Sequence, residues 1–163
     1  MSSNDVGFPL ASTDLAAASK LQGLLPGLLS LSLNAKQAHW NVVGPAFVPL
    51  HQLTDELAKD ALTWADLIAE RAMALGYSVD ARPRTVAAES DDLPAGRLRD
   101  DHVVSSLIGL TARVARNARH AVRDLDQEPV GQDLAIQVLH GLERYQWMFR
   151  AQLAAGFDPT TPE

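Results

Sequence analysis

Four side chains of metal-binding type occur at regular spacing in the first half of the chain. His39 and His51 lie on either side of the segment "WNVVGPAFVPL", and Asp66 and Glu70 follow in "DLIAE". Imidazole and carboxylate ligands together, with coordination positions left open, suit Fe(II) redox chemistry better than a closed zinc site. These four residues are therefore the candidate ligands of a non-haem iron site.

The spacing prevents one chain from completing such a site. His51 and Asp66 belong to the same predicted helix, and fifteen residues at about 1.5 Å each place them about 22 Å apart. Metal–ligand bonds are only about 2 Å long. His39 can approach His51 across the loop, whereas Asp66 and Glu70 need another partner. A two-fold dimer with this helix packed antiparallel against its copy supplies one and creates two identical sites.

Three neighbouring side chains have two interpretations each. Asp55 lies one helical turn after His51, where it either binds metal or simply orients the imidazole. Trp40 and Trp147 are typical of core or interface packing, but Trp40 adjoins His39, and both are also candidate electron donors during peroxide reduction. Trp64 is interpreted as interface packing.

Hydrophobic periodicity predicts four long helices and an all-α fold. The predicted ranges are 13–41, 49–75, 97–126 and 132–155, with a crossover over 78–96 that has room for a short helix. Pro26–Gly27 predicts a kink within the first helix rather than two separate helices. Its apolar stripe consists of Leu15, Leu21, Leu25, Leu28, Leu29 and Leu33.

The long connection in the middle is typical of a ferritin-like four-helix bundle. That helical domain is predicted over residues 13–156, between a short N-terminal tail (1–12) and a short acidic C-terminal tail (157–163). Ferritin's own di-iron centre, however, needs Glu-x-x-His on two helices, and no Glu of this chain has a His three residues later. Any iron is therefore handled elsewhere than at such a centre.

Composition narrows the classes of function. With 163 residues the chain suits one domain, and the absence of Cys excludes disulfides and thiolate sites. The N-terminus lacks the basic and apolar regions of a signal peptide, and no apolar run is long enough for a transmembrane helix. We expect a cytoplasmic protein with no membrane partner, and the net charge of -6 suits one that attracts cations.

Two segments together resemble the Dps family of miniferritins, whose ferritin-like subunits form hollow dodecamers. They are "KQAHWNVVGPAFVPLHQLTDEL" and "DLIAERAMALG", and the end of the last helix, "WMFRAQL", is also family-like. The resemblance implies a ferroxidase that oxidises Fe(II), preferably with hydrogen peroxide, and stores the ferric product in a homododecameric shell. This activity would protect against oxidative damage.

The same resemblance assigns the site. His39 and His51 of one subunit, with Asp66 and Glu70 of its two-fold mate, look like the ferroxidase ligands that hold non-haem Fe(II) and Fe(III). Asp55 looks like the acid that helps to place a second iron or a bridging water. By the same likeness, the acidic turn before the last helix lines a pore that admits iron, with Asp133, Asp124 and Asp126 as candidate pore residues.

The alternative function is that of a nucleoid-associated Dps whose main work is compacting DNA. Residues 1–12 and 151–163 contain no Lys or Arg, and twelve copies at -6 would give a shell charge of roughly -72. Direct DNA binding is therefore disfavoured, unless Mg²⁺ bridges or a helical stripe of arginines reaches the phosphates. That stripe is Arg113, Arg116, Arg119 and Arg123; the other histidines, His102, His120 and His140, are interpreted as surface or structural.

Overall fold

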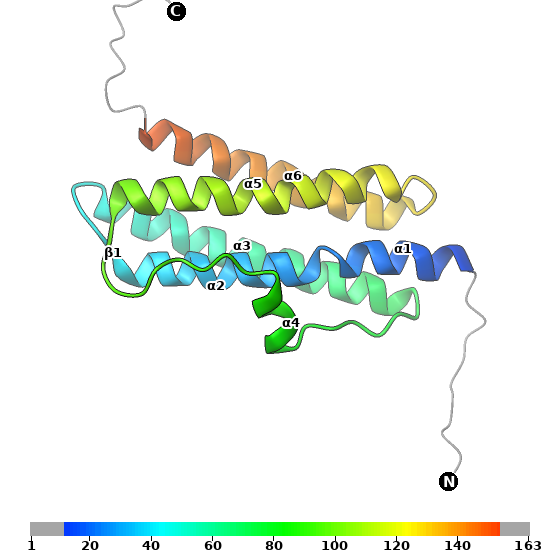
Figure 1. Ribbon diagram of the computed structural model, residues 1–163. Coiled ribbons are helices and arrows are strands. Elements are labelled where there is room, and N and C mark those ends of the chain that lie inside the picture. Colours follow the sequence, from blue (N-terminus) through cyan, green and yellow to red (C-terminus); the bar gives the residue numbers. More distant parts are fainter. Residues whose placement is uncertain (1–11, 154–163) are drawn as a thin grey trace, which may run out of the picture.

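The computed structural model describes residues 12–153, which form six helices and one pair of very short strands (Figure 1). In chain order they are α1 (Ser12–Gln22), α2 (Leu25–Asn41), β1 (Val42–Val43), α3 (Phe47–Ala74), α4 (Pro83–Ala88), β2 (Leu98–Arg99), α5 (Asp100–Asp124) and α6 (Pro129–Leu153). Apart from Ser12, which begins α1, the two predicted tails lie outside the described residues, so their boundaries stay predictions.

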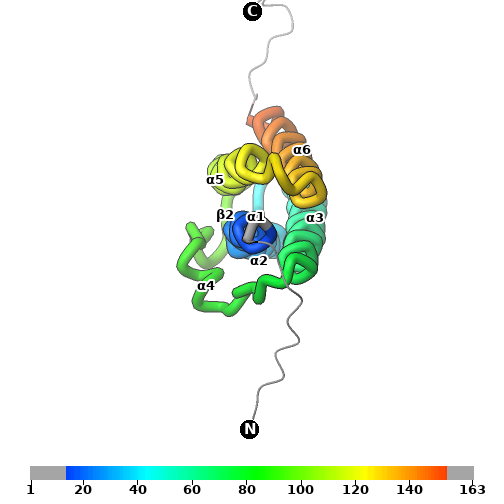
Figure 2. The backbone as a smooth tube through the Cα atoms, turned by 90° about the vertical axis from the view of Figure 1, so that its right-hand side faces the viewer, coloured from blue at the N-terminus to red at the C-terminus, as the bar shows by residue number. Residues whose placement is uncertain are grey.

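The long helices surround one apolar core. Figure 2 looks along the bundle and shows α1 with α2, α3, α5 and α6 as its four sides, with the crossover and α4 on the outside. Alanines at the core-facing positions of α3, among them Ala58, Ala61 and Ala65, are buried and let the neighbouring helices approach closely. The predicted all-α bundle, with a short helix in a long crossover, is confirmed.

The expected kink in the first helix was wrong, because the helix is interrupted. Gly23 and Leu24 form a turn in which the Leu24 N–H donates to the Leu21 carbonyl (2.9 Å), and α2 then restarts with Pro26 in its first turn. Pro26 has no N–H to continue the ladder of α1, whereas the first turn of a new helix needs none. In Figure 1, α1 and α2 lie end to end, so they still form one side of the bundle.

Hydrogen bonds from polar side chains attach the crossover to the side of the bundle formed by α1 and α2. The Gln22 side chain donates to the Asp80 carbonyl and accepts from the Asp80 N–H, both at 2.9 Å. Farther along, the buried Asn34 side chain accepts from the Leu93 N–H at 2.8 Å. The crossover ends in β2, which pairs in parallel with β1. This two-residue pairing was not predicted, and it anchors the crossover beside the segment that links His39 to His51.

No helix within residues 12–153 combines the length and apolar character needed to cross a membrane.

Candidate metal centre

The two histidines form a closed pair at one end of the bundle. His39 lies in the last turn of α2 and His51 in the second turn of α3, and their rings stack with centroids 3.7 Å apart. The Nδ1 atom of His39 lies 2.7 Å from the His51 carbonyl oxygen, and Nδ1 of His51 lies 2.8 Å from the His39 carbonyl oxygen. Each ring is therefore fixed by the backbone of the other residue.

This reciprocal bonding decides the chemistry of both rings. A carbonyl oxygen only accepts hydrogen bonds, so each Nδ1 must carry a proton and donate it. In the neutral imidazole the lone pair then lies on Nε2. Metal-binding histidines are commonly oriented in this way, with the second ring nitrogen bonded to a carbonyl or carboxylate. The pair thus presents two Nε2 atoms suited to a divalent cation.

The loop between the histidines is locked from another part of the chain. Gly44 has φ +136°, and a Cβ at this position would collide with the Asp100 carboxylate. The same carboxylate accepts a hydrogen bond from the Ala46 N–H at 3.0 Å. Asp100 begins α5, directly after β2. The pairing of β1 with β2 and this hydrogen bond together hold the loop in place.

The two carboxylates lie far from the histidines within the chain. Asp66 and Glu70 are exposed on α3, which runs as one uninterrupted helix through His51, so the separation of about 22 Å follows from the helical rise. Within residues 12–153, no group of three or more His, Asp or Glu side chains of one chain comes close enough to share a metal ion. The structure brings together His39 with His51, but not these with Asp66 and Glu70.

Asp55 is held by two lysines. Its Oδ1 lies 2.7 Å from Nζ of Lys36, on α2, and its Oδ2 lies 2.7 Å from Nζ of Lys59, one turn later on α3. The Lys36 hydrogen bond, followed by that of Lys59, holds the pKa of the Asp55 carboxyl well below its usual range. Lys36 also lies over the Trp40 ring, 5.4 Å from its centroid. Asp55 is therefore an anion whose two oxygens both already face a cation.

The candidate pore carboxylates near the start of α6 already have side-chain partners in the subunit. Asp124 pairs with Lys20 at 3.0 Å, and this hydrogen bond lowers the pKa of Asp124. Asp124 and Asp126 line the same hollow of about 210 Å³. Asp133 is exposed one turn into α6, where Gln137 donates to it at 2.6 Å. Asp124 and Asp126 thus precede α6 in the chain, whereas Asp133 belongs to it.

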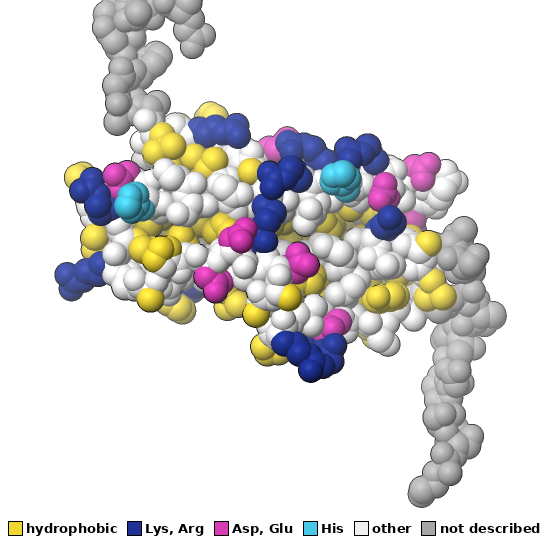
Figure 3. Space-filling model, viewed as in Figure 1, with side chains coloured by type: hydrophobic (Ala, Val, Ile, Leu, Met, Phe, Trp, Pro, Cys, Tyr) yellow, Lys and Arg dark blue, Asp and Glu magenta, His cyan; other side chains and the backbone are white. Residues whose placement is uncertain are grey.

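The predicted arginine stripe follows the exposed side of α5, where Lys and Arg side chains gather in Figure 3. Arg119 pairs with Glu143 at 2.6 Å, and the Arg123 guanidinium donates to Nδ1 of His120 at 2.9 Å. Arg113 lies 3.6 Å from Asp91 and also donates to the Glu89 carbonyl. His102 and His140 are exposed, so all three remaining histidines lie at the surface.

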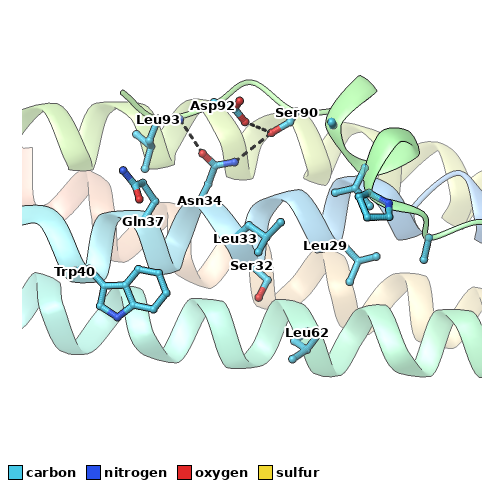
Figure 4. A pocket seen from close by; sticks show the side chains of 14 residues that line it. Leu29, Ser32, Leu33, Asn34, Gln37, Trp40, Leu62, Ser90, Asp92 and Leu93 are labelled. Carbon is cyan, nitrogen blue, oxygen red and sulfur yellow. Dashed lines mark hydrogen bonds between the residues drawn. The ribbon is translucent and has the colours of Figure 1, made fainter. Parts of the chain in front are cut away.

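A groove between α2, α3 and the crossover with α4 extends from Trp40, next to His39, toward Asp66. Its larger part has a volume of about 750 Å³ and is lined by apolar side chains that point outward, including Leu33, Trp40 and Leu62 (Figure 4). They are 66%, 68% and 54% exposed. A second hollow of about 570 Å³ shares Leu29 and Leu62 with the first and extends to Asp66. Leu33 therefore belongs to this open face, not to the core that its stripe predicted.

Several residues near the site escaped the sequence interpretation. The i, i+4 spacing of Asp55 and Lys59 was a readable signal. The ion pair between Arg71 and Glu128 (2.5 Å) was not, since these residues are far apart in sequence. It fixes the carboxylate end of α3 to the start of α6, where Glu128 also accepts from the Gly131 N–H at 2.7 Å. Burial alone would raise the pKa of Glu128, but these two hydrogen bonds outweigh it and lower the pKa.

The tryptophans Trp147 and Trp64 lie in different environments. Trp147 is 68% exposed on α6. Trp64 packs inside the subunit, edge-on against buried Tyr145 with ring centroids 6.4 Å apart, and directly over Gly141. Trp64 therefore packs within the subunit at least in part, and its contribution to an interface stays a prediction. Glycine at position 141 leaves the space on α6 that the indole fills.

Comparisons with known proteins identify the family of this helical bundle. A family model described as "Ferritin-like domain" matches residues 18–156. "DNA protection during starvation protein 2" of Deinococcus radiodurans is 35% identical over 145 residues, which cover 87% of this chain but only 59% of that protein. The "Fine tangled pili major subunit" of Haemophilus ducreyi is 34% identical over 155 residues, covering 92% and 80% of the two chains.

Solved structures extend the match to the whole fold. The structure of Dps from Microbacterium arborescens "in the high iron form" has a TM-score of 0.85 at 31% identity and covers 91% of this chain and 97% of that one. Dps92 from Deinococcus radiodurans has a TM-score of 0.83 at 35% identity, with 91% and 92% covered. By its domain match, its relatives and its fold, the chain belongs to the Dps family of ferritin-like proteins.

Proposed function

We propose that this chain is the subunit of a ferroxidase and iron-storage homododecamer. Fe(II) is the substrate and hydrogen peroxide the preferred oxidant, and the ferric product is stored as mineral inside the shell. The observation that carries the proposal is the pair formed by His39 and His51, in which both rings are fixed through Nδ1 and both Nε2 atoms are available to iron.

The carboxylates of the centre come from a second copy. The open groove on α2 and α3 contains exposed Leu33, Trp40 and Leu62 and extends from the histidine side to Asp66, so a copy packed antiparallel on it brings Asp66 and Glu70 to the partner's histidines. Covering these apolar side chains also favours association. Each dimer then contains two centres with two imidazoles and two carboxylates each.

The reaction balances without a resident cofactor. Two Fe(II) ions give one electron each to one hydrogen peroxide molecule, whose O–O bond breaks, and two protons complete two water molecules. The two-electron route releases no hydroxyl radical, so it would protect against oxidative damage. Trp40, next to His39, and Trp147 are the candidate reserve electron donors for peroxide that meets only one iron.

Iron reaches the interior through carboxylate-lined pores in this proposal. Asp133 lies one turn into α6, Asp124 ends α5 and Asp126 lies in the turn between them, and a symmetric ring of such carboxylates would concentrate Fe(II). Asp133 is the strongest of the three candidates, because Lys20 already neutralises Asp124.

The proposal is tested by loading metal-free protein with Fe(II) under anaerobic conditions, adding peroxide, and recording ferric absorbance in the near ultraviolet. Fast oxidation that consumes two Fe(II) per peroxide is expected, and oxidation no faster than in buffer would refute the function. Light scattering should give a particle of about twelve times 17.6 kDa. A stable monomer at neutral pH would contradict the shared centre.

A second candidate function, DNA binding, is favoured by one observation, the basic surface of α5. Arg116 is exposed there, and Arg119 and Arg123 extend the stripe. Opposing it is the net charge of -6 per chain. A gel-shift assay at low salt, with and without Mg²⁺, separates the two functions. Retardation that Arg116→Ala weakens would support a role in the nucleoid, whereas no retardation leaves the protein as a cytoplasmic iron store.

A further inference from the structure

A buried tyrosine bonds to the helix that carries the carboxylate half of the proposed centre. Tyr145, on α6, is fully buried, and its hydroxyl donates a hydrogen bond of 2.7 Å to Oδ2 of Asp60, on α3. A buried hydroxyl needs a partner of this kind, so the bond has a structural role in joining α6 to α3. The surroundings of the phenol give it a chemical role as well.

An indole ring lies between this tyrosine and the carboxylate ligands. The ring of Trp64 stands edge-on to that of Tyr145 with the centroids 6.4 Å apart, and Trp64 is itself partly buried against the core. Trp64 and Asp66 lie within one turn of α3, which is about 5.4 Å of helix. In a chain without cysteine, tyrosine and tryptophan are the side chains that most readily lose a single electron. Two oxidisable rings in contact therefore lead from the turn of Asp66 into the core.

Asp60 can accept the proton that a phenol releases when it is oxidised. Burial, followed by the hydrogen bond to Asp60, raises the pKa of Tyr145 well above its usual range, so the phenol keeps its proton at neutral pH. Loss of an electron makes a phenol strongly acidic, and a base takes the proton from about 2.6–3.2 Å away. Oδ2 of Asp60 lies within this range, and the guanidinium of Arg144 lies 3.5 Å from the same oxygen. Asp60 is partly exposed, so it can pass the proton on to water.

A centre that holds one Fe(II) needs another electron when it meets peroxide. Reduction of hydrogen peroxide to two water molecules takes two electrons, and a single Fe(II) supplies only one, which by itself releases a hydroxyl radical. Trp40 and Trp147 are both 68% exposed, so a radical on either ring would be open to attack by solutes. A radical on Tyr145 would be enclosed by the bundle.

On the basis of the proposed ferroxidase function, we propose that Tyr145 is an electron donor to a centre that holds one Fe(II), with Trp64 as relay and Asp60 as proton acceptor. The Fe(II) ion and the phenol give one electron each to hydrogen peroxide, and its O–O bond breaks. The phenolic proton moves to Asp60, and two protons from solvent complete two water molecules. A second Fe(II) that arrives later returns an electron to the phenoxyl radical, and Asp60 returns the proton. The sum is again two Fe(II) oxidised per peroxide.

Freeze-quench electron paramagnetic resonance tests this role on the intact oligomer. Metal-free protein receives one Fe(II) per chain under anaerobic conditions, followed by one equivalent of hydrogen peroxide. A tyrosyl radical is expected. The chain has two tyrosines, so Tyr145→Phe should abolish the signal, whereas the matched control Tyr77→Phe should retain it. A second Fe(II) added afterwards should remove the signal and appear as Fe(III).

Three further variants separate electron donation from a structural role of the hydrogen bond. Asp60→Asn keeps a hydrogen-bond acceptor of similar size that does not take up a proton. The radical should then form at least about tenfold more slowly, since a positioned base typically contributes roughly 10²-fold or more. Trp64→Phe removes the relay and should also slow radical formation. His39→Ala/His51→Ala should give no radical, because iron is then not held at the centre.

The outcomes distinguish this role from the ferroxidase function. Oxidation of two Fe(II) per peroxide without a tyrosyl signal, or with one that persists in Tyr145→Phe, would overturn the role of Tyr145 and leave the ferroxidase proposal intact. An unchanged rate of radical formation in Asp60→Asn would overturn the role of Asp60 as proton acceptor. Oxidation of Fe(II) no faster than in buffer would overturn both proposals.

Discussion

The two halves of the proposed centre differ in how much of their geometry one chain provides. The histidine half is complete before any partner arrives, because His39 and His51 stack and bond to each other's backbone. The carboxylate half, Asp66 and Glu70, consists of exposed side chains on a rigid helix, whose position is set only by the packing of α3. Preorganisation in one half and exposure in the other is the division expected of a site that assembles between two copies.

The largest expected effect comes from removing the ligands of either half of the proposed centre. His39→Ala/His51→Ala and Asp66→Ala/Glu70→Ala should each lose ferroxidase activity by more than about 100-fold, because loss of supporting groups alone typically costs 10–100-fold. Ferric absorbance after peroxide addition measures the loss.

The two inactive variants should nevertheless rescue each other. In a mixed dimer one centre carries both lesions and the other is wild type, so random pairing should return roughly a quarter of wild-type activity. Co-expression ensures mixing. Fully mixed shells that stay inactive would show that the four ligands do not meet across the dimer interface.

Stability should distinguish how the carboxylate half is positioned. Glu128→Gln removes the charge that binds Arg71, next to Glu70, and should lower the free energy of unfolding at pH 7 by about 2–3 kcal/mol, below the usual cost of breaking a buried pair because Arg71 is partly exposed. Denaturant unfolding measures it. Glu143→Gln, which removes an exposed pair with Arg119, should cost less than about 1 kcal/mol.

The ion pair of Glu128 should also make the stability of the protein depend on pH. The pKa of Glu128 is lower in the folded protein than its ordinary value of 4.5, so the carboxylate stabilises the fold above that pH. This contribution is lost as the pH falls through the lowered pKa. The stability difference between wild type and Glu128→Gln should therefore shrink below about pH 4.5. A constant difference from pH 7 to pH 3 would mean that the ion pair does not stabilise the fold.

The histidines should matter for the fold, and the carboxylates should not. His39→Ala/His51→Ala removes two hydrogen bonds and should lower the free energy of unfolding of the metal-free protein by about 2 kcal/mol, since each bond typically contributes about 1. Asp66→Ala/Glu70→Ala should change it by less than about 0.5 kcal/mol per site, as exposed substitutions usually do. Equal losses in chemical denaturation would remove the contrast between the halves.

The smallest expected effect concerns supply rather than chemistry. Asp133→Asn removes one charge from each chain and three from each pore ring, so iron uptake should slow by about two- to five-fold at low salt. Oxidation of Fe(II) already bound should be unchanged. Initial rates measured across ionic strengths provide the check, and rates equal to wild type throughout would point to another route into the shell.

Sequence periodicity predicted the long helices apart from the interruption of the first, and the short loop predicted the histidine half. His39 and His51 lie on consecutive helices joined by a short loop, so local geometry brings them together. The pairing of Asp55 with Lys36 depends on how α2 lies against α3, and that of Arg71 with Glu128 on the far end of the bundle. The spacing of residues along one helix does not determine how two helices are aligned, so neither ion pair could be predicted from it.

Two local features were also missed. The turn at Gly23 and Leu24 replaced a kink because Pro26 starts a new helix as readily as it bends an old one. The pairing of Val42 with Leu98 involves strands too short to show any alternation of apolar and polar residues. Whether Asp66 and Glu70 meet the histidines depends on a second chain, so this contact stays a prediction.

The lock on the histidine loop has a consequence for how the protein is made. Ribosomes release the N-terminal part of a chain first, at about 5–20 residues per second, and early segments begin to fold before later ones emerge. The α2–α3 hairpin contains both histidines, but Ala46 and Gly44 obtain their partner only when Asp100 arrives with β2. A nascent chain therefore carries the histidine pair without this support for several seconds, and the proposed iron chemistry would have to wait until the second half of the bundle has been synthesised.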